Sequence, residues 1–394
     1  AVPGGSRVPV VAPPRDARGE GCRHTTLRCG ASGRRGGRAP SVVHTSASVP
    51  DWGHGASAKA LHQEEAAVFQ GIFDLEGRGA ATLNANSGER EDANAKTLAV
   101  QAMITTCPDA YTLCSIAETH WRDFDATATV RALAWLAKFK SLEASAAGGE
   151  GASALPREAE GATRLKSLVA KFANDFSTKD LVLLLGGFAQ LGWAITPALS
   201  DRSRSLAVSS NLDKLSCQEV VCCVWALGKI SANALKPSKR VLKSLEECCL
   251  SHCTSANGIE TSQLVQMVWG FGQLGHRLPA DTWFEALKAS TSQLDDVKSL
   301  QPSEQALFAW SLSRVGLTSD RQVGKGLLRA FKATVKQYDL LSMNTMLKCF
   351  HLMKVKVPQD LLAKCEVRCL QCMSKCETGA ISDFIYRCVK TRHA

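Results

Sequence analysis

The stretch Leu215 to Ser231, LSCQEVVCCVWALGKIS, decides the fold of this chain because close copies of it recur. The clearest second copy is Ile259 to Gly275, IETSQLVQMVWGFGQLG, and two more run from Phe176 to Gly192 and from Leu300 to Gly316. Each copy has an apolar residue, a polar cap, an apolar run and then a Trp or Gly that is followed by small and apolar residues. Self-similarity at a period of about 20–50 residues predicts a repeat array, and such arrays usually provide extended binding surfaces.

When the copies are aligned on Trp225, the alignment extends to seven repeats, and the residues aligned with Trp225 form a column. Its members are Ala134, Gly186, Trp225, Trp269, Trp310, Phe350 and Tyr386, with steps of 52, 39, 44, 41, 40 and 36 residues. The longest step contains the Gly/Ala/Ser-rich stretch Ala146 to Ala154, which a surface loop would absorb. In the first copy the Trp is displaced by one position, to Trp135.

Each repeat is predicted to form two helices. The first helix opens with a polar cap, most clearly Ser177-x-x-Asp180 and Ser216-x-x-Glu219. The second follows a proline that suits a helix start, and these prolines are Pro197, Pro237, Pro279 and Pro358. The first helix is apolar around most of its circumference, as expected for a helix inside a stack. We therefore predict an all-α fold, an α-solenoid of about seven helical hairpins of roughly 36–52 residues each.

Four Trp side chains are expected to act as structural anchors inside this stack: Trp135, Trp225, Trp269 and Trp310. Small residues follow the anchors, such as Ala226 and Gly228 in one copy and Gly270 and Gly272 in the next. Small residues beside a bulky ring allow two helices to approach closely.

Composition divides the chain into three parts. Residues 1–55 are predicted to be a disordered, transit-peptide-like segment, because residues 1–50 hold eight Arg, no Lys and only two acids. Residues 56–120 are expected to form short helices and a polar linker, and residues 121–394 the helical-repeat array. The first segment predicts an organellar location, a mitochondrion or alternatively a plastid.

Charge and cysteine content limit the possible classes further. The net charge is +10, of which residues 1–50 carry +6, so the other 344 residues carry only +4. Nucleic-acid binding would therefore need a local stripe of cations. The sequence contains no run of 18 apolar residues, so no membrane-spanning helix is predicted. The 16 Cys are scattered through apolar helical positions, which indicates a reducing compartment.

One polar column stands out, four residues after the anchor. It holds Lys138, Gln190, Lys229, Gln273, Arg314, Lys354 and Lys390. Stacked repeats would place these side chains in a row that could follow a phosphate backbone or hydrogen-bond splayed bases, which makes them candidate RNA contacts. Cations in the last turn of a helix also oppose the helix dipole favourably, so helix electrostatics alone could explain the column.

The stretches W-A-L-G-K-I and W-G-F-G-Q-L, at Trp225 and Trp269, resemble the octotricopeptide repeats of algal organelle proteins. They are also similar to the helical repeats of FAST-kinase-like proteins and of subunits of the mitochondrial RNA-editing substrate-binding complex. The resemblance covers roughly residues 124–394 and implies an RNA-binding array.

The sequence offers one candidate metal-binding motif, a row of cysteines, and no catalytic motif. Cys365, Cys369 and Cys372 have a spacing used to hold iron–sulfur clusters, but spacings of four and three, continued by Cys376, put all these thiols on one face of a helix. A core-facing stripe is the favoured interpretation, and we expect no metal. No zinc-protease, phosphate-loop or nucleophile-elbow motif occurs.

These patterns together predict a non-catalytic protein, without a cofactor, a small-molecule substrate or a membrane partner. It would bind single-stranded organellar RNA, with other proteins of a ribonucleoprotein complex as further partners, and so support RNA processing, editing, stability or translation. The alternative is a protein-binding scaffold or a ribosome-associated structural solenoid.

Overall fold

The structure is a computed structural model that describes residues 88–146, 160–206, 212–231, 237–254, 259–290, 297, 300–318, 321–372 and 378–392. Contacts divide the chain into the units Ala1–Pro50 and Asp51–Ala394, and every described residue lies in the second. The predicted disordered segment 1–55 and the helix expected over 57–74 therefore lie outside the described residues.

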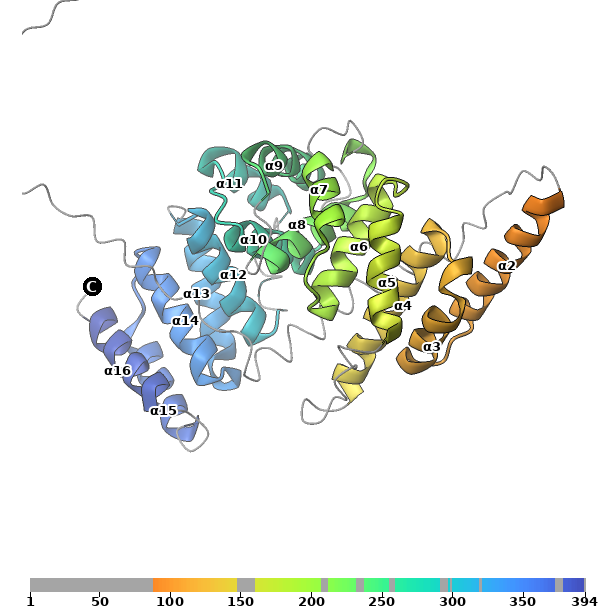
Figure 1. The fold of residues 1–394 in the computed structure, drawn as a ribbon. Coiled ribbons are helices and arrows are strands. Elements are labelled where there is room, and N and C mark those ends of the chain that lie inside the picture. Colours follow the sequence, from red (N-terminus) through yellow and green to blue (C-terminus); the bar gives the residue numbers. More distant parts are fainter. Residues whose placement is uncertain are drawn as a thin grey trace, which may run out of the picture. The chain divides into compact units, whose positions relative to one another are not determined.

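The described part of the chain is all-α, as predicted: it forms fifteen α-helices, a few 3₁₀ turns and no strand. Figure 1 labels the helices. They are α2 (Gly88–Thr105), α3 (Ala110–His120), α4 (Ala126–Ala146), α5 (Glu160–Lys171), α6 (Thr178–Leu191), α7 (Pro197–Ser205), α8 (Cys217–Ser231), α9 (Lys239–Cys253), α10 (Thr261–Gln273), α11 (Ala280–Ser290), α12 (Pro302–Val315), α13 (Arg321–Thr334), α14 (Leu340–Leu352), α15 (Gln359–Cys372) and α16 (Thr378–Arg392).

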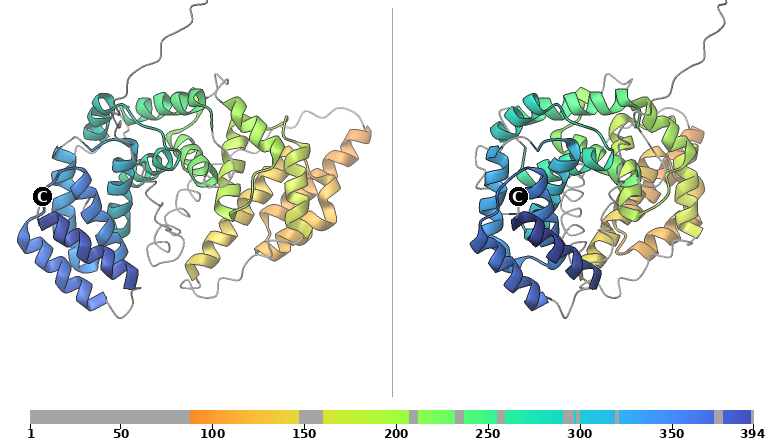
Figure 2. Two further views of the ribbon diagram at one scale, coloured as in Figure 1. Left: turned by 60° about the vertical axis from the view of Figure 1, so that its left-hand side comes forward. Right: turned by 90° about the vertical axis from the view of Figure 1, so that its left-hand side faces the viewer.

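The even-numbered helices are the first helices of the repeats, and each contacts the next one from α2 to α16. The odd-numbered helices are the second helices. The contacts join α3, α5, α9, α13 and α15 to the first helix of their own repeat, and they join second helices to one another at α3–α5, α5–α7 and α9–α11. Helices close in sequence also lie side by side in both views of Figure 2. The hairpin repeat is therefore real, whereas the solenoid path of the whole array stays a prediction.

The hairpin α2–α3 adds to the array before its expected start. α2 contacts α4 and α3 contacts α5, which are the contacts that the later hairpins also make. Its sequence carries no Trp box, and residues 88–94 had the composition of a linker. Packing on α4 and α5, through buried Val100, Ile104 and Leu113, gives these residues their place in the stack.

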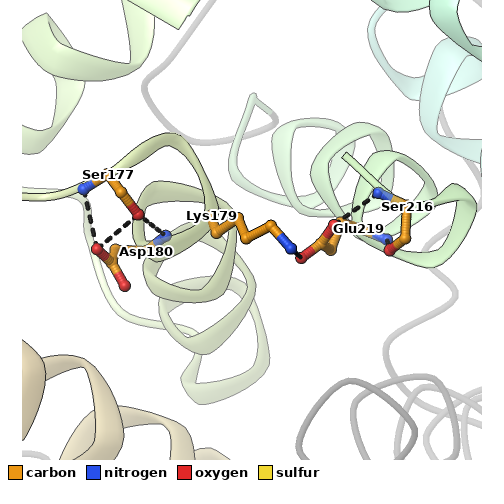
Figure 3. A network of polar contacts seen from close by, with 5 residues as sticks. All are labelled: Ser177, Lys179, Asp180, Ser216 and Glu219. Carbon is orange, nitrogen blue, oxygen red and sulfur yellow. Dashed lines mark hydrogen bonds and ion pairs between the residues drawn. The ribbon is translucent and has the colours of Figure 1, made fainter. Parts of the chain in front are cut away.

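Polar caps fix where the first helices begin. Ser177 and Asp180 form a reciprocal capping box at α6. At α8, the Glu219 carboxylate accepts the Ser216 N–H at 2.6 Å, and the Ser216 hydroxyl accepts the Glu219 N–H at 3.3 Å. Lys179 connects the two caps, since its Nζ lies 3.2 Å from Glu219 Oε1, as Figure 3 shows. The beginnings of α6 and α8 therefore lie side by side, and both helices satisfy N–H groups that would otherwise lack partners.

Counting from the cap gives a structural register. The N-cap residue is position 0 in the first helices from α4 to α14: Asp125, Ser177, Ser216, Glu260, Gln301 and Asp339. In α16, the first helical residue Thr378 is counted as position 1. Position 9 is then the Trp column and position 13 the polar column. At position 15, the backbone of Gly192, Gly275 and Gly316 takes a left-handed conformation that ends the helix.

The register of the α14 repeat differs from the sequence-based alignment by two residues. Lys354, not a glycine, occupies position 15 there with φ 54°, and the N–H of Val355 donates to Phe350 O just as that of Trp193 donates to Phe188 O. Phe350 is therefore equivalent to Phe188, at position 11, and not to the Trp column. The assignment of Phe350 to the Trp column was wrong, because the aromatic residue of this repeat lies at position 11, as Phe188 does in α6, and Lys348 takes position 9.

Glycines allow the first helices to approach closely, as the small-residue pattern predicts. A Cβ added to Gly270 would lie 2.6 Å from the carbonyl oxygen of Val224 on α8, and one added to Gly228 would lie 2.9 Å from Gly270 Cα. One added to Gly272 would lie 3.7 Å from the ring of Trp310. At Gly228 and Gly270, backbone lies against backbone and leaves no room for side chains, so these two glycines are a packing requirement.

Candidate nucleic-acid interface

The polar column lies at position 13, at or near the carboxyl end of the first helices. Lys138, Lys229 and Gln273 are half-buried, and Arg314 and Lys390 are exposed. Gln190 is buried, and its Oε1 has no hydrogen-bond partner. Lys354 belongs to position 15 by the register above, and Leu352 takes position 13 in its repeat. The structure therefore places five of the seven candidate residues in a column that reaches the surface.

Four cations of this column lie over an aromatic ring on their own helix. The Nζ of Lys138 lies 4.5 Å from the centroid of the Trp135 ring, and that of Lys229 lies 4.7 Å from the Trp225 ring. The Arg314 guanidinium lies 5.7 Å from the Trp310 ring, and Lys390 Nζ lies 5.0 Å from the Tyr386 ring.

A cation over a ring face is held by the ring quadrupole, worth about 0.5–1 kcal/mol at exposed sites. Each ring thus orders the cation that follows it by one turn. An ammonium or guanidinium held in this way keeps its N–H donors, which can reach phosphate oxygens or base edges. The Trp column and the polar column therefore act as one unit in α8 and α12.

The helix dipole accounts for only part of this column. Lys229 and Arg314 do lie in the last turns of α8 and α12, where a cation is favoured. Lys138 does not, because α4 continues beyond it to Ala146. The expectation that this column is the last turn of every first helix was therefore wrong for α4, and the ring of Trp135 explains the position of Lys138 better.

The ends of neighbouring first helices lie side by side, which brings column members near one another. Lys140 Nζ donates to Leu191 O, at the end of α6, at 2.8 Å. A Cβ on Gly272, at position 12 of α10, would lie 3.3 Å from the Cβ of Arg314, at position 13 of α12. Contacts of this kind place the Gln273 and Arg314 positions on adjacent helices of one surface.

Burial supports the predicted packing role of three Trp anchors. Trp225, Trp269 and Trp310 are 4, 9 and 4 % exposed. Trp135 is only half-buried, since it is displaced to position 10, and it stacks at 5.7 Å with Phe139. It therefore combines a packing role with an exposed face beside Lys138.

Four further pairs of cations and rings, outside the polar column, were not anticipated from the sequence. The guanidinium groups of Arg122 and Arg164 lie 5.3 and 5.1 Å from the centroid of the Trp121 ring. Lys166 lies 4.5 Å from the Trp193 ring, and Lys171 lies 4.7 Å from the Phe172 ring. Arg164 and Lys166 belong to α5, and the rings that they contact lie outside that helix. Only the adjacent pairs Trp121–Arg122 and Lys171–Phe172 offer a signal in the sequence.

The cysteine stripe faces the core where the structure describes it. Cys365 and Cys369 are buried, Cys372 is half-buried, and Cys376 lies outside the described residues. Burial raises the pKa of the Cys365 thiol to about 12 and does the same for Cys223 and Cys349. Metal ligation and nucleophilic attack need the thiolate, so these groups have the protonation state of structural cysteines.

We expect iodoacetamide at pH 8 to leave Cys223, Cys349 and Cys365 unmodified in the native protein. Their raised pKa and burial keep them as inaccessible thiols, whereas in the unfolded chain their pKa returns to about 8.5 and alkylation follows. Mass spectrometry of peptides after native and denatured labelling measures this. Equal labelling of Cys365 in both states would contradict the structural assignment.

Within the described ranges no helix is long and apolar enough to cross a membrane. In that same part of the chain, no three His, Cys, Asp or Glu side chains are grouped so that they could hold a metal ion. No family model matches this sequence, and no curated protein matches it significantly.

Proposed function

We propose that this protein binds single-stranded RNA along the surface-reaching part of the polar column. The observation that carries the proposal is the pairing of Lys138, Lys229, Arg314 and Lys390 with rings one turn earlier. Isolated surface cations sample many rotamers, whereas a cation over a ring is partly ordered before it meets a ligand. Such ordering lowers the entropy that binding would cost.

Single-stranded RNA suits this surface better than a duplex does. The cations lie on every second first helix, α4, α8, α12 and α16, so neighbouring cations are about two interaxial distances of 8–10 Å apart. The amide of Gln273 lies between Lys229 and Arg314 in this order. A flexible strand can adapt its phosphates to such spacing, and an amide can hydrogen-bond the edges of unstacked bases. Of the seven candidate RNA contacts in the polar column five remain, since Gln190 is buried and Lys354 lies outside the column.

The proposed role is non-catalytic. The protein would hold organellar RNA, in a mitochondrion or alternatively a plastid, and support its processing, editing, stability or translation together with other proteins. The resemblance of the Trp boxes to organellar RNA-binding repeats and the arginine-rich composition of residues 1–50 support this context.

We expect binding to single-stranded RNA to weaken with salt, and to do so less steeply when the column is neutralised. Log affinity falls as log salt rises, and the variant with Lys138→Gln, Lys229→Gln and Arg314→Gln should make this slope shallower by about 2. Each phosphate contact contributes about 0.7 for single strands. Fluorescence anisotropy with a labelled oligonucleotide at several salt concentrations measures both slopes.

Lys354→Gln is the matched control, since it removes one charge at the end of a first helix but outside the column. Its match is Lys229→Gln alone, which should reduce the slope by about 0.7, whereas Lys354→Gln should leave the slope unchanged. An unchanged slope in the triple variant would refute the column as the binding surface. No affinity for RNA even at low salt would instead favour a protein-binding scaffold, a function compatible with the net +4 of residues 51–394.

A further inference from the structure

The last hairpin carries an apolar surface that nothing in the described part of the chain covers. On α15, Val367 and Leu370 are 57 and 69 % exposed, and on α16, Ile385, Tyr386 and Val389 are 56, 54 and 49 % exposed. Single exposed apolar residues are ordinary, but Val389 lies four and three residues after Ile385 and Tyr386, so these three form a patch on one face of α16. Patches of this kind mark interaction sites.

The other first helices show what normally covers this surface. Position 8 is 0 % exposed in all six first helices from α4 to α14: Leu133, Leu185, Val224, Val268, Ala309 and Leu347. In two of the interfaces it lies against a glycine of the next first helix, Leu133 against Gly187 and Val224 against Gly270. Ile385 holds position 8 in α16 and is exposed. The face of α16 thus has the composition of an interior interface, and the matching surface is a helix with small residues.

A surface of that kind is exposed at the other end of the array. On α2, the residues Ala95, Leu98, Ala99 and Ala102 are all exposed, and their spacings of three and four place them on one helical face. Leu98 is 47 % exposed, and the opposite face of α2 buries Val100 and Ile104. α2 therefore has two apolar faces, of which only one is covered by the described residues.

The two end hairpins also differ in charge. The helices α2 and α3 contain four acidic and two basic residues, a net charge of −2 with His neutral. The helices α15 and α16 contain three acidic and five basic residues, a net charge of +2. Opposite charge favours contact between unlike ends and disfavours contact between like ends.

We propose that the C-terminal hairpin of one copy of this protein docks on the N-terminal hairpin of a second copy. The large apolar residues of α16 pack on the alanine face of α2, as position 8 packs on small residues within the array. This contact joins unlike surfaces, so it leaves one free face of each kind and continues head to tail. Because Tyr386 lies in this patch and its ring also orders Lys390, the association is measured without RNA.

Sedimentation velocity of the full chain without RNA tests this association. The average mass of the wild type should rise with concentration above that of one chain. Ile385→Glu on α16 and Ala99→Glu on α2 each place a charge in one end face, so each variant alone should stay monomeric. An equimolar mixture of the two should form a species of about twice the monomer mass and nothing larger, because each variant keeps the intact face that the other one needs.

Lys325→Glu, an exposed change on α13 that alters the charge by two units, more than either end-face variant does, is the control and should associate like the wild type. Circular dichroism should show the same helix content in all variants, since the substituted side chains are exposed. A wild type that stays monomeric at all concentrations would overturn the proposal, as would a monomeric mixture. Continued association of Ala99→Glu alone would also overturn it, since the C-terminal faces would then meet each other.

Discussion

Gly270→Val is expected to lower the free energy of unfolding by about 3 kcal/mol or more, the upper end of what overpacking costs. The new Cβ would lie 2.6 Å from Val224 O and 2.8 Å from Val224 Cγ1. The first of these is a backbone atom inside α8, so it cannot move without separating the two helices. The clash outweighs the gain in helix propensity, because glycine is disfavoured by only about 1 kcal/mol.

Urea unfolding followed by circular dichroism measures the effect. Repeat arrays gain stability from interfaces between neighbours, so a weakened α8–α10 interface should also split a single transition into two, one for each side of the interface. Gly379→Val is the control, because nothing lies within 4 Å of its added Cβ and the expected change is within about 0.5 kcal/mol. Similar losses in both variants would show that Gly270 is not a packing requirement.

Trp225→Ala is expected to cost about 3–5 kcal/mol, the usual range for removal of a large buried aromatic side chain. The Trp225 side chain is 4 % exposed between first helices, and neighbouring helices cannot fully collapse into the space that it leaves. The change also removes the ring below Lys229. Thermal or urea unfolding measures the loss of stability.

Tyr386→Ala is the matched control for this variant. Tyr386 occupies the same position 9 and carries the same kind of cation, Lys390, but 54 % of it is exposed. Measured at low protein concentration, its loss should cost less than about 1 kcal/mol. If both variants lost the same stability, the Trp column would owe its effect to the cation pair and not to burial.

The helices themselves could be predicted from the sequence because their signals are local. The cap boxes at Ser177 and Ser216 lie where they were expected, and Pro197, Pro237, Pro279 and Pro358 lie at or just before the starts of second helices. The small residues around Trp269 and Trp310 allow the close approach that their pattern indicates. Hydrogen bonds, caps and helical periodicity span only a few residues, so a short window of sequence contains them.

The residues of the candidate site could be predicted less well from the sequence. Gln190 has the same sequence context as Lys229 and Gln273, yet it is buried. Lys354 was assigned to the polar column because its repeat resembles the others in composition, and its left-handed backbone reveals the two-residue shift. The pairs of cations and rings follow helical spacings of three and four residues, so the sequence contained that signal without distinguishing it from helix electrostatics.

The sequence by itself determined the all-α class, the hairpin period and the apolar character of both sides of each first helix. Only the tertiary structure decided which of these sides is covered. Leu347 and Ile385 have equivalent positions and similar chemistry, but Leu347 is fully buried and Ile385 is 56 % exposed. The physical reason is that an apolar pattern records a preference for burial, whereas burial itself depends on a neighbouring helix that lies elsewhere in the chain or in another molecule.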